Sequence, residues 1–502
     1  MSSARLTISI HSPIGAIDRR LFGSFVEHLG RSVYDGIYEP GHPTADANGF
    51  REDVLALVRE LGVSTIRYPG GNFVSGFRWE DGVGPRAERP TRLDLAWHSS
   101  ESNQVGIHEF ATWLEAAGSE LMYAVNLGTR GVQEALDVLE YTTVRSGTAL
   151  SDARVANGRS EPFGISMWCL GNEMDGPWQL GHRSADDYGK LAAQTARAMR
   201  QLDDRIQLVV CGSSSSSMPT FGAWERTVLE HTYEDVDFIS CHAYYNEKDG
   251  DRASFLASAV DMDRFIEAVA AAADEVKAAK GSDKTIQISF DEWNIWNIDR
   301  YHEEDKHTAI DDWPLAPRLL EDTYSVLDAV VFGSLLISLL KHADRVTSAS
   351  LAQLVNVIAP IMTEPDGIAW KQTTFFPFAI TSRLARGTSL DVQVSVESFD
   401  TRQFGEVPLV DAVATWDEQE GTMAVFLVNR GESAPVTVTI DGVAGATVTE
   451  AWTLADDDIL AANTLSDPER VSMNTNQSAR ITGSTVTVEL PPVSWTALAL
   501  RL

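Results

Sequence analysis

The sequence predicts an α/β fold: a closed (β/α)8 barrel, or TIM barrel, with an accessory antiparallel β-sandwich of jelly-roll type. Short apolar strands alternate with amphipathic helices over about the first four-fifths of the 502 residues. Eight such strands are present, and eight strands can close into a barrel that has no free edges. After about Gly387 the helical patterns stop, and only alternating strand patterns follow.

The predicted barrel strands are short apolar runs, rich in β-branched or aromatic residues, that end in glycine or in polar residues. They span residues 21–30, 62–71, 120–128, 163–173, 206–214, 236–245, 285–293 and 348–358. Strands that alternate with helices indicate parallel βαβ units in which the helices cover the sheet. We expect amphipathic helices at residues 51–61, 108–118, 184–202 (with Ser184 as N-cap), 255–280 and 322–343. A doubly wound open sheet is the alternative, but no Gly-rich nucleotide-binding motif follows any strand.

The remaining strand patterns indicate a second domain. Beyond residue 387, alternating strands are separated by turns of Gly, Asp and Pro, as in a β-sandwich. Residues 5–11 show the same alternation before the first barrel strand, so we expect them to pair within the sandwich. The predicted domains are therefore a barrel of residues 18–386 and a sandwich of residues 1–17 plus 387–502.

Composition restricts the class of partner. The chain carries 72 acidic and 40 basic side chains, a net charge of −32, which disfavours nucleic acid and anionic membrane surfaces. A neutral ligand fits better. The N-terminal residues lack the features of a signal peptide, and no run of about 18 apolar residues predicts a membrane span. We therefore expect a cytoplasmic protein.

The sequence predicts neither a disulfide framework nor a metal or other cofactor. Its three cysteines, Cys169, Cys211 and Cys241, lie in or at the end of apolar runs, as buried reduced thiols do. A zinc site built from them with His242 and Glu173 is the alternative, but no C-x-x-C or H-x-x-x-H spacing supports it. The tract HEEDKH, residues 302–307, has histidines five apart that cannot share one helical face, so we expect a solvated loop.

Polar side chains follow nearly every predicted barrel strand. The active sites of such barrels lie at the carboxyl ends of the strands, so these side chains should converge on one mouth. Any one of them alone is more often an ordinary loop residue, but together they replace the usual turn residues with charged and amide groups. They are Glu27, Arg67, Asn72, Asn126, Asn172, Glu173, His242, Tyr244, Glu292 and Gln353.

Glu173 and Glu292 close strands four and seven, on opposite sides of the predicted mouth. Two carboxyl groups that flank one bond are the apparatus of glycoside hydrolysis, in which one group is protonated and the other ionised. Arg67 and the hydroxyl of Tyr244 are suited to hold one carboxylate ionised. Sugar hydroxyls also need amides, and sugar rings need flat aromatic faces. The candidate amides are Asn72, Asn172 and Gln353, and the candidate aromatics are Trp97, Trp178 and Trp296.

At these residues the sequence resembles the family 51 glycoside hydrolases, the α-L-arabinofuranosidases of the clan A barrels. An Asn-Glu pair after strand four is a weak signal alone, but several long stretches match the family in order and spacing. With the sandwich, the likeness covers essentially the whole chain. The matching stretches are RYPGGNFVSGFRWEDGVGP, WCLGNEMDGPWQLGH, CHAYY, FDEWN and AQLVNVIAP.

The resemblance implies a retaining, exo-acting enzyme that releases terminal α-L-arabinofuranosyl residues from arabinan- or arabinoxylan-derived oligosaccharides by double displacement. It makes Glu173 the general acid/base and Glu292 the nucleophile. It also implies a homo-oligomer, often a hexamer. Arg67, His242 and Tyr244 match positions at the nucleophile; Glu27, Asn72, Asn172 and Gln353 match positions that bind sugar hydroxyls; Trp97 and Trp296 match pocket walls.

One position departs from the family, and three other functions remain as alternatives. Asn297 stands where many members have a tyrosine, which bears on the leaving-group side and not on the carboxylates. An endo-acting clan A glycanase predicts an open cleft. A non-catalytic carbohydrate-binding barrel predicts that one glutamate is missing, whereas both are present. A metal-dependent barrel enzyme predicts sensitivity to a chelator.

Overall fold

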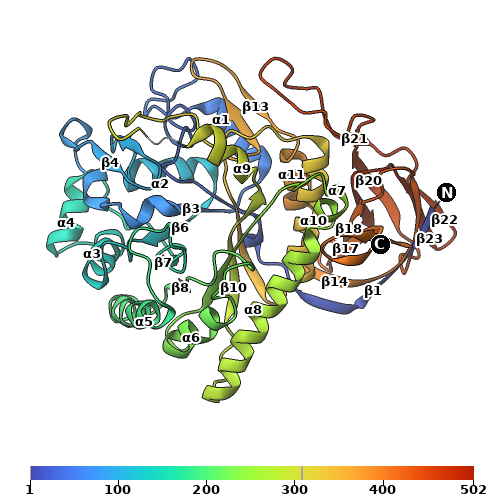
Figure 1. Cartoon of the computed structure of the whole chain (residues 1–502), viewed down its shortest axis with the longest axis horizontal. Coiled ribbons are helices and arrows are strands. Elements are labelled where there is room, and N and C mark those ends of the chain that lie inside the picture. The colour runs from blue at the N-terminus through green and yellow to red at the C-terminus, as the bar shows by residue number, and fades with distance from the viewer. Residues whose placement is uncertain (1, 307–308) are drawn as a thin grey trace.

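The computed structural model describes residues 2–306 and 309–502. Eight parallel strands form a closed barrel in the order β10-β11-β2-β3-β6-β7-β8-β9 (Figure 1). Each lies within or across one of the eight predicted strands, so the barrel is confirmed and the open doubly wound sheet is wrong. The strands are β2 (Gly23–Phe25), β3 (Thr65–Tyr68), β6 (Glu120–Val125), β7 (Met167–Leu170), β8 (Gln207–Val210), β9 (Phe238–Tyr245), β10 (Gln287–Ile295) and β11 (Val346–Leu351).

The barrel strands are buried on both faces, which is why they read as continuous apolar runs. In β7 all four residues are buried. Met167 and Cys169 pack inside the barrel, whereas Trp168 and Leu170 pack outward with the main core. This alternation follows from the two-residue period of a strand.

Helices surround the barrel, and four substantial ones were not predicted. The predicted helix at 255–280 is two helices, because the chain breaks at Ala257 and Ser258, where the Ser258 hydroxyl bonds to the carbonyl of Phe255. Ser184 caps its helix as predicted, accepting a hydrogen bond from the backbone of Asp187. The predicted helices are α1 (Glu52–Leu61), α2 (Ile107–Ala117), α5 (Ala185–Leu202), α7 (Arg252–Leu256), α8 (Ala259–Lys280) and α10 (Val326–Lys341); the others are α3 (Val132–Thr143), α4 (Ala149–Ala156), α6 (Ala223–Thr232), α9 (Ile298–Arg300) and α11 (Phe375–Leu384).

Shorter elements shape the loops around the barrel. Residues 301–305 form a single π-helical turn, whereas a solvated loop was expected at residues 302–307; residues 302–304 are exposed, as a solvated tract should be. His302 is exposed, and His307 lies outside the described residues. The remaining short elements are η1 (Arg19–Phe22), η2 (Asn72–Ser75), η3 (Trp79–Gly82), η4 (Arg86–Glu88) and η5 (Tyr301–Asp305), with the strand pairs β4 (Arg92–Asp94) and β5 (Ser99–Glu101), β12 (Ile361–Thr363) and β13 (Ala369–Lys371), and β15 (Ser398–Thr401) and β16 (Gly405–Pro408).

The C-terminal domain is built on one ten-stranded sheet in the order β21-β20-β24-β18-β17-β14-β1-β19-β23-β22. As predicted, the N-terminal strand joins it: β1 pairs with β14 antiparallel and with β19 parallel. That parallel pair is the exception in an otherwise antiparallel sheet. The sheet closes around its own apolar core. Its strands are β1 (Ser2–Ala16), β14 (Thr388–Ser395), β17 (Val410–Asp417), β18 (Thr422–Asn429), β19 (Val436–Asp441), β20 (Thr447–Leu454), β21 (Asn474–Thr475), β22 (Arg480–Thr482), β23 (Thr485–Leu490) and β24 (Ser494–Arg501).

Helix α10 joins the two domains, and Figure 1 shows it between the barrel and the sheet. Gly333 of α10 lies against Trp495, where a Cβ would come within 2.2 Å of the indole. Lys341, at the end of the same helix, forms an ion pair with Asp411, and Arg430 binds the other oxygen of Asp411 at 2.7 Å. Apolar packing and a charged triad therefore fix the barrel against the sandwich. The division into residues 18–386 and the remainder stays our proposal.

Within the described residues, none of the helices has both the length and the apolar character needed to cross a membrane.

Candidate active site

The turn after β7 carries Glu173 into the mouth of the barrel. Gly171 has φ +93°, the left-handed conformation that glycine adopts without strain, and it turns the chain after β7. Glu173 itself has φ +42°, an uncommon value for a residue with a side chain. The amide of Gly176 donates to the carbonyl of Glu173 at 2.8 Å and closes the turn. Glu173 is thus held on a tight, left-handed turn.

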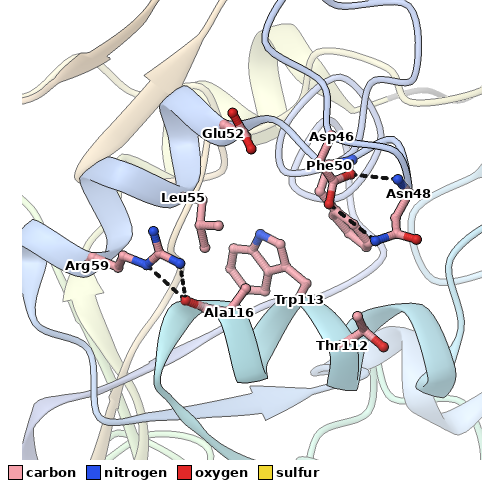
Figure 2. Close-up of a pocket in the computed structure, with 9 residues that line it drawn as sticks. All are labelled: Asp46, Asn48, Phe50, Glu52, Leu55, Arg59, Thr112, Trp113 and Ala116. Carbon is pink, nitrogen blue, oxygen red and sulfur yellow. Dashed lines mark hydrogen bonds between the residues drawn. The ribbon is translucent and has the colours of Figure 1, made fainter.

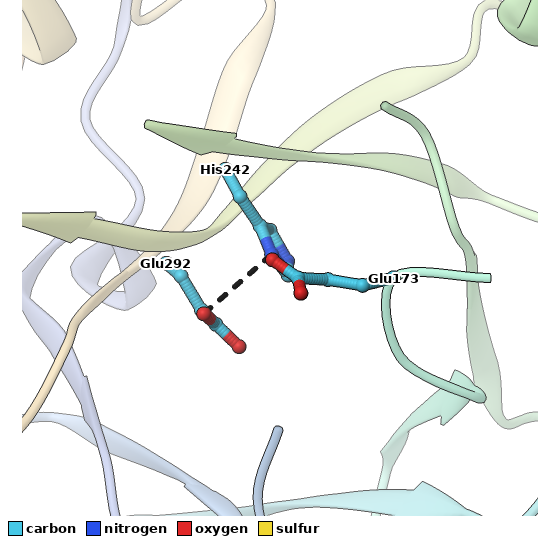
Figure 3. Close-up of side chains that lie close together, drawn as sticks. All are labelled: Glu173, His242 and Glu292. Atoms are coloured by element: carbon cyan, nitrogen blue, oxygen red, sulfur yellow. Dashed lines mark hydrogen bonds and ion pairs between the residues drawn. The ribbon is translucent and has the colours of Figure 1, made fainter. Parts of the chain in front are cut away.

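Glu173 follows the end of β7, and it meets His242 and Glu292, which lie in the carboxyl-terminal halves of β9 and β10 (Figure 3). His242 Nδ1 lies 2.9 Å from Oε1 of Glu173 and 3.6 Å from Oε2 of Glu292. A ring nitrogen of His242 and one carboxyl oxygen from each glutamate all lie within 4.8 Å of one another. Burial lowers the pKa of His242, but the charge of Glu292 and the hydrogen bond with Glu173 outweigh it and raise that pKa. The two carboxyl groups therefore favour the protonated form of His242.

Glu292 is held in its ionised form. Arg67 donates to its Oε1 at 2.7 Å, and Tyr244 donates to its Oε2 at 2.6 Å. Burial alone would raise the pKa of Glu292, but the charges of His242 and Arg67 and the hydrogen bonds from Tyr244 and Arg67 lower it. The predicted pairing of Arg67 and Tyr244 with one carboxylate is confirmed.

The amides predicted to bind sugar lie beside this pair. Arg67 donates a second hydrogen bond, at 2.6 Å, to Oδ1 of Asn172. The Nδ2 of Asn172 is 3.3 Å from Oδ1 of Asn72 and 3.3 Å from Oε1 of Gln179. Arg67 and its amide partners thus form one connected polar layer beneath the carboxylates.

Glu27 lies on the other side of Glu292, after β2. Its Oε1 accepts from the backbone of Phe73 at 2.9 Å and from the indole of Trp97 at 2.8 Å, and its Oε2 accepts from Gln353 at 3.2 Å. Burial raises the pKa of Glu27 to about 8 in spite of these donors. A Cβ on Gly71 would lie 3.1 Å from Glu292 and 3.2 Å from Glu27, so both carboxyl groups border the space above that glycine.

Aromatic rings form a wall between Glu27 and Glu292. The wall runs from Trp97, which bonds to Glu27, through Tyr301 and Trp296 to Tyr244, which bonds to Glu292. Successive ring centroids lie 6.0, 6.0 and 5.1 Å apart. The wall therefore includes Trp97 and Trp296, the two rings expected to line the pocket.

Trp178 reaches the site from the loop after Glu173. Its indole nitrogen donates to Oε2 of Glu173 at 2.7 Å, while 53% of the residue is exposed to solvent. All twelve predicted site residues therefore belong to one connected set. Asn126 does not: its side chain holds the turn at residues 128–129 and is structural.

Comparison with known proteins identifies the family. The family models "Alpha-L-arabinofuranosidase 1 domain" and "Alpha-L-arabinofuranosidase C-terminal domain" match residues 57–254 and 291–494. The chain is 58% identical over 513 residues to an exo-alpha-(1->6)-L-arabinofuranosidase of Bifidobacterium longum. The match covers 100% of this chain and 98% of that relative. It is 56% identical to an intracellular exo-alpha-(1->5)-L-arabinofuranosidase of Streptomyces lividans, over 99% of this chain and 75% of that relative. A solved family 51 alpha-L-arabinofuranosidase from B. longum matches with a TM-score of 0.96 at 50% identity over 100% of both chains.

The chain belongs to the family 51 α-L-arabinofuranosidases.

Three residues of this arabinofuranosidase site were not predicted: Asp175, Gln179 and Tyr301. Asp175 lies two residues after Glu173 and accepts from the backbone and hydroxyl of Ser214 at 3.0 and 3.1 Å. Burial raises its pKa to about 6. Gln179 joins the amide layer, and Tyr301 completes the aromatic wall. The stretch shared with the family contains Asp175 and Gln179, but nothing in their spacing distinguished them from loop residues.

The departure at Asn297 has a structural counterpart. Asn297 caps the short helix α9, accepting from the backbone of Arg300. That helix leads directly into the π-helical turn of Tyr301, whose ring lies between Trp97 and Trp296. An aromatic ring is therefore supplied four residues later in the chain.

The cysteines of this arabinofuranosidase do not form the zinc set considered from the sequence. Among the described residues, the group with metal-binding geometry is Glu173, His242 and Glu292, which includes no cysteine. All three cysteines are buried, and burial raises the pKa of each thiol, which disfavours the thiolate that zinc requires. Arg67 already places a positive charge against Glu292.

A cavity of about 430 Å³ lies away from the carboxylates, between α1 and α2 on the outside of the barrel (Figure 2). Its lining includes Asp46, Arg59 and Trp113 and none of the predicted site residues. Arg59 in this cavity donates to the carbonyl of Ala116 and is already engaged in the fold. Neither Glu173 nor Glu292 lines this cavity.

Proposed function

We propose that this chain is a retaining, exo-acting α-L-arabinofuranosidase in which Glu292 is the nucleophile and Glu173 the general acid/base. One observation carries the proposal: a carboxyl oxygen of Glu173 lies within 4.8 Å of a carboxyl oxygen of Glu292. Retaining glycosidases hold their carboxyl groups about 5–5.5 Å apart, whereas inverting enzymes leave about 6.5–9.5 Å for a water molecule. The short separation supports direct attack by a carboxylate.

In the first step, Glu292 attacks the anomeric carbon of the arabinofuranosyl group. Arg67 and Tyr244 keep Glu292 ionised and aim its oxygens, as the lowered pKa of this carboxyl group requires. Glu173 gives its proton to the glycosidic oxygen as the bond to the leaving group breaks. The products are a free alcohol, an arabinosyl ester of Glu292, and ionised Glu173.

In the second step, ionised Glu173 takes a proton from water as that water attacks the anomeric carbon. The ester bond breaks, Glu292 leaves as a carboxylate, and arabinose is released with its original anomeric configuration. His242 contacts both carboxylates, so its positive charge stabilises whichever of them is ionised. Each group thus returns to its starting protonation state.

The surrounding polar groups support binding of a single furanose ring. Glu27, Asn72, Asn172 and Gln353 offer acceptors and donors for its hydroxyls on the two sides of Glu292. The aromatic wall of Trp97, Tyr301, Trp296 and Tyr244 offers apolar surface for the ring. We assign terminal, non-reducing arabinofuranosyl groups of arabinan- or arabinoxylan-derived oligosaccharides as substrates, because relatives are named exo-acting arabinofuranosidases.

Linkage, location and assembly are further parts of the proposal. Relatives are named for both the (1->6) and the (1->5) linkage, so both should be assayed. We propose a cytoplasmic location, supported by relatives from Streptomyces lividans and Bacillus subtilis that are named intracellular. A homo-oligomer, with the hexamer as first choice, is checked by light scattering after gel filtration.

The test is a proton NMR time course with an aryl α-L-arabinofuranoside. Early appearance of the α-anomer of arabinose supports retention, whereas early β-anomer means inversion and a wrong role for Glu292. Release of internal fragments from a polymer, with no arabinose, favours an endo-acting glycanase. Loss of activity with a chelator, restored by a divalent metal, favours metal-dependent chemistry at Glu173, His242 and Glu292.

A further inference from the structure

Trp178 bonds directly to the side chain of Glu173. Its N–H donates to Oε2 at 2.7 Å, while His242 faces Oε1 at 2.9 Å. The two neighbours fix both oxygens of this carboxyl group. A carboxyl oxygen has two lone pairs, so the indole engages one lone pair of Oε2 and leaves the other free toward the mouth.

The backbone under this indole has no room for a side chain. A Cβ on Gly176 would lie 2.5 Å from Cε2, 2.7 Å from Cζ2 and 2.9 Å from Nε1 of Trp178. The φ of Gly176 is not positive, so the backbone conformation itself does not demand glycine. The glycine is instead needed because the indole rests on it.

We propose that Trp178 is the positioning residue for Glu173, and that Gly176 permits this by letting the indole lie against the turn. The proposal rests on the role of Glu173 proposed above. By fixing Oε2, the indole directs the proton of Glu173 toward the glycosidic oxygen in the first step. In the second step the same N–H stabilises the ionised carboxyl group that acts as base.

The two steps give Trp178 a kinetic signature. The value of kcat/KM reports events up to departure of the leaving group, and an activated aryl leaving group needs no proton. Loss of the indole N–H should therefore spare kcat/KM for an aryl arabinofuranoside and lower it for an arabinobiose. It should also lower kcat for the aryl substrate, because release of arabinose from Glu292 still needs the base.

The experiment compares Trp178→Phe, Gly176→Ala and the double variant with the wild type on 4-nitrophenyl α-L-arabinofuranoside and on arabinobiose. Trp178→Phe should lower kcat/KM for arabinobiose by about tenfold or more, as expected for loss of a charge-assisted hydrogen bond, and leave the aryl value within about twofold. Gly176→Ala should reproduce this pattern with the tryptophan still present. The double variant should lose little more kcat/KM on arabinobiose than Trp178→Phe alone, because both changes break the same bond.

Matched controls remove similar features elsewhere. Trp452 of the sandwich donates its N–H to Glu450 at 2.8 Å, so Trp452→Phe deletes the same kind of bond away from the mouth. Gly41→Ala adds a methyl group where no atom lies within 4 Å. Both controls should keep wild-type kinetics on both substrates.

The proposal is overturned if Trp178→Phe affects kcat/KM for the two substrates equally, or if Gly176→Ala acts like Gly41→Ala. A crystal structure of Gly176→Ala gives a readout that does not depend on activity: the indole should be displaced from Glu173, and an intact bond contradicts the inference. Failure of the proposed function would look different, because the wild type itself would release the β-anomer or no arabinose.

Discussion

Tyr244 donates its phenolic hydrogen to Oε2 of Glu292 over 2.6 Å. The bond stabilises the ionised carboxylate, and it helps lower the pKa of Glu292 against the effect of burial. A lowered pKa keeps Glu292 ionised, and hence able to attack, further into the acid range. With Glu292 as the proposed nucleophile, Tyr244 contributes, together with His242 and Arg67, to the pH at which activity is lost on acidification.

Tyr244→Phe should therefore move the acid limb of the kcat/KM profile upward by about one pH unit, since the ionised form loses one hydrogen bond. The ring, which packs against Trp296, is kept. Rates with 4-nitrophenyl arabinofuranoside across the acid range measure the shift. An unchanged limb, or one that moves down, contradicts the role given to this hydroxyl.

Glu292→Ala should lower kcat by at least about 10⁴-fold on every substrate, because no carboxylate remains to form the ester. Added azide should not restore a product of retained configuration. Product configuration is read by NMR. A retained arabinosyl azide from this variant would mean that another residue is the nucleophile.

Glu173→Ala should lower kcat/KM for arabinobiose by about 10²–10⁴-fold and spare the activated aryl substrate, because only the sugar leaving group needs a proton. Azide should raise kcat for the aryl substrate and give a product of retained configuration, since it attacks the ester without a base. Equal losses of kcat/KM on both substrates would exclude the acid role.

Asp411→Asn should destabilise the protein at neutral pH by about 3–5 kcal/mol, because Lys341 and Arg430 lose the carboxylate that both of them bind. Burial would raise the pKa of Asp411, but these two charges lower it to about 2. Its folded pKa lies below its unfolded value, so its contribution is complete above the usual aspartate range and is lost as pH falls toward 2.

Denaturant unfolding of Asp411→Asn and wild type at several pH values tests this prediction. The gap in unfolding free energy should be constant near neutrality and narrow in acid. Asp441→Asn is the matched control, because its partner Arg5 is mostly exposed and such pairs contribute little. A gap as large in the control would show that any lost aspartate has this effect.

The strands of the barrel could be predicted because each is buried on both faces and reads as an apolar run. Helix α11 could not, because Pro377 reads as a helix breaker; it lies in the first turn, where its missing N–H costs nothing. The break at Ala257 and Ser258 was hidden because apolar residues continue through it.

The same distinction holds in the site. Glu173 and Glu292 could be predicted because topology brings strand ends together. The place of Tyr301 depends on a π-helical turn, and the bond from Trp178 to Glu173 depends on space above Gly176. Neither is a property of spacing along the chain, so the sequence alone could not predict either of them.

The place of β1 in the sandwich sheet has a consequence for biosynthesis. Strand β1 precedes the barrel in the chain, yet it lies between β14 and β19, whose residues are made only after the whole barrel. During translation β1 must stay unpaired while the barrel residues are made, and it gains its second neighbour, β19, only once residue 441 has been made. Pairing of β1 is thus a late event that joins segments far apart in the sequence.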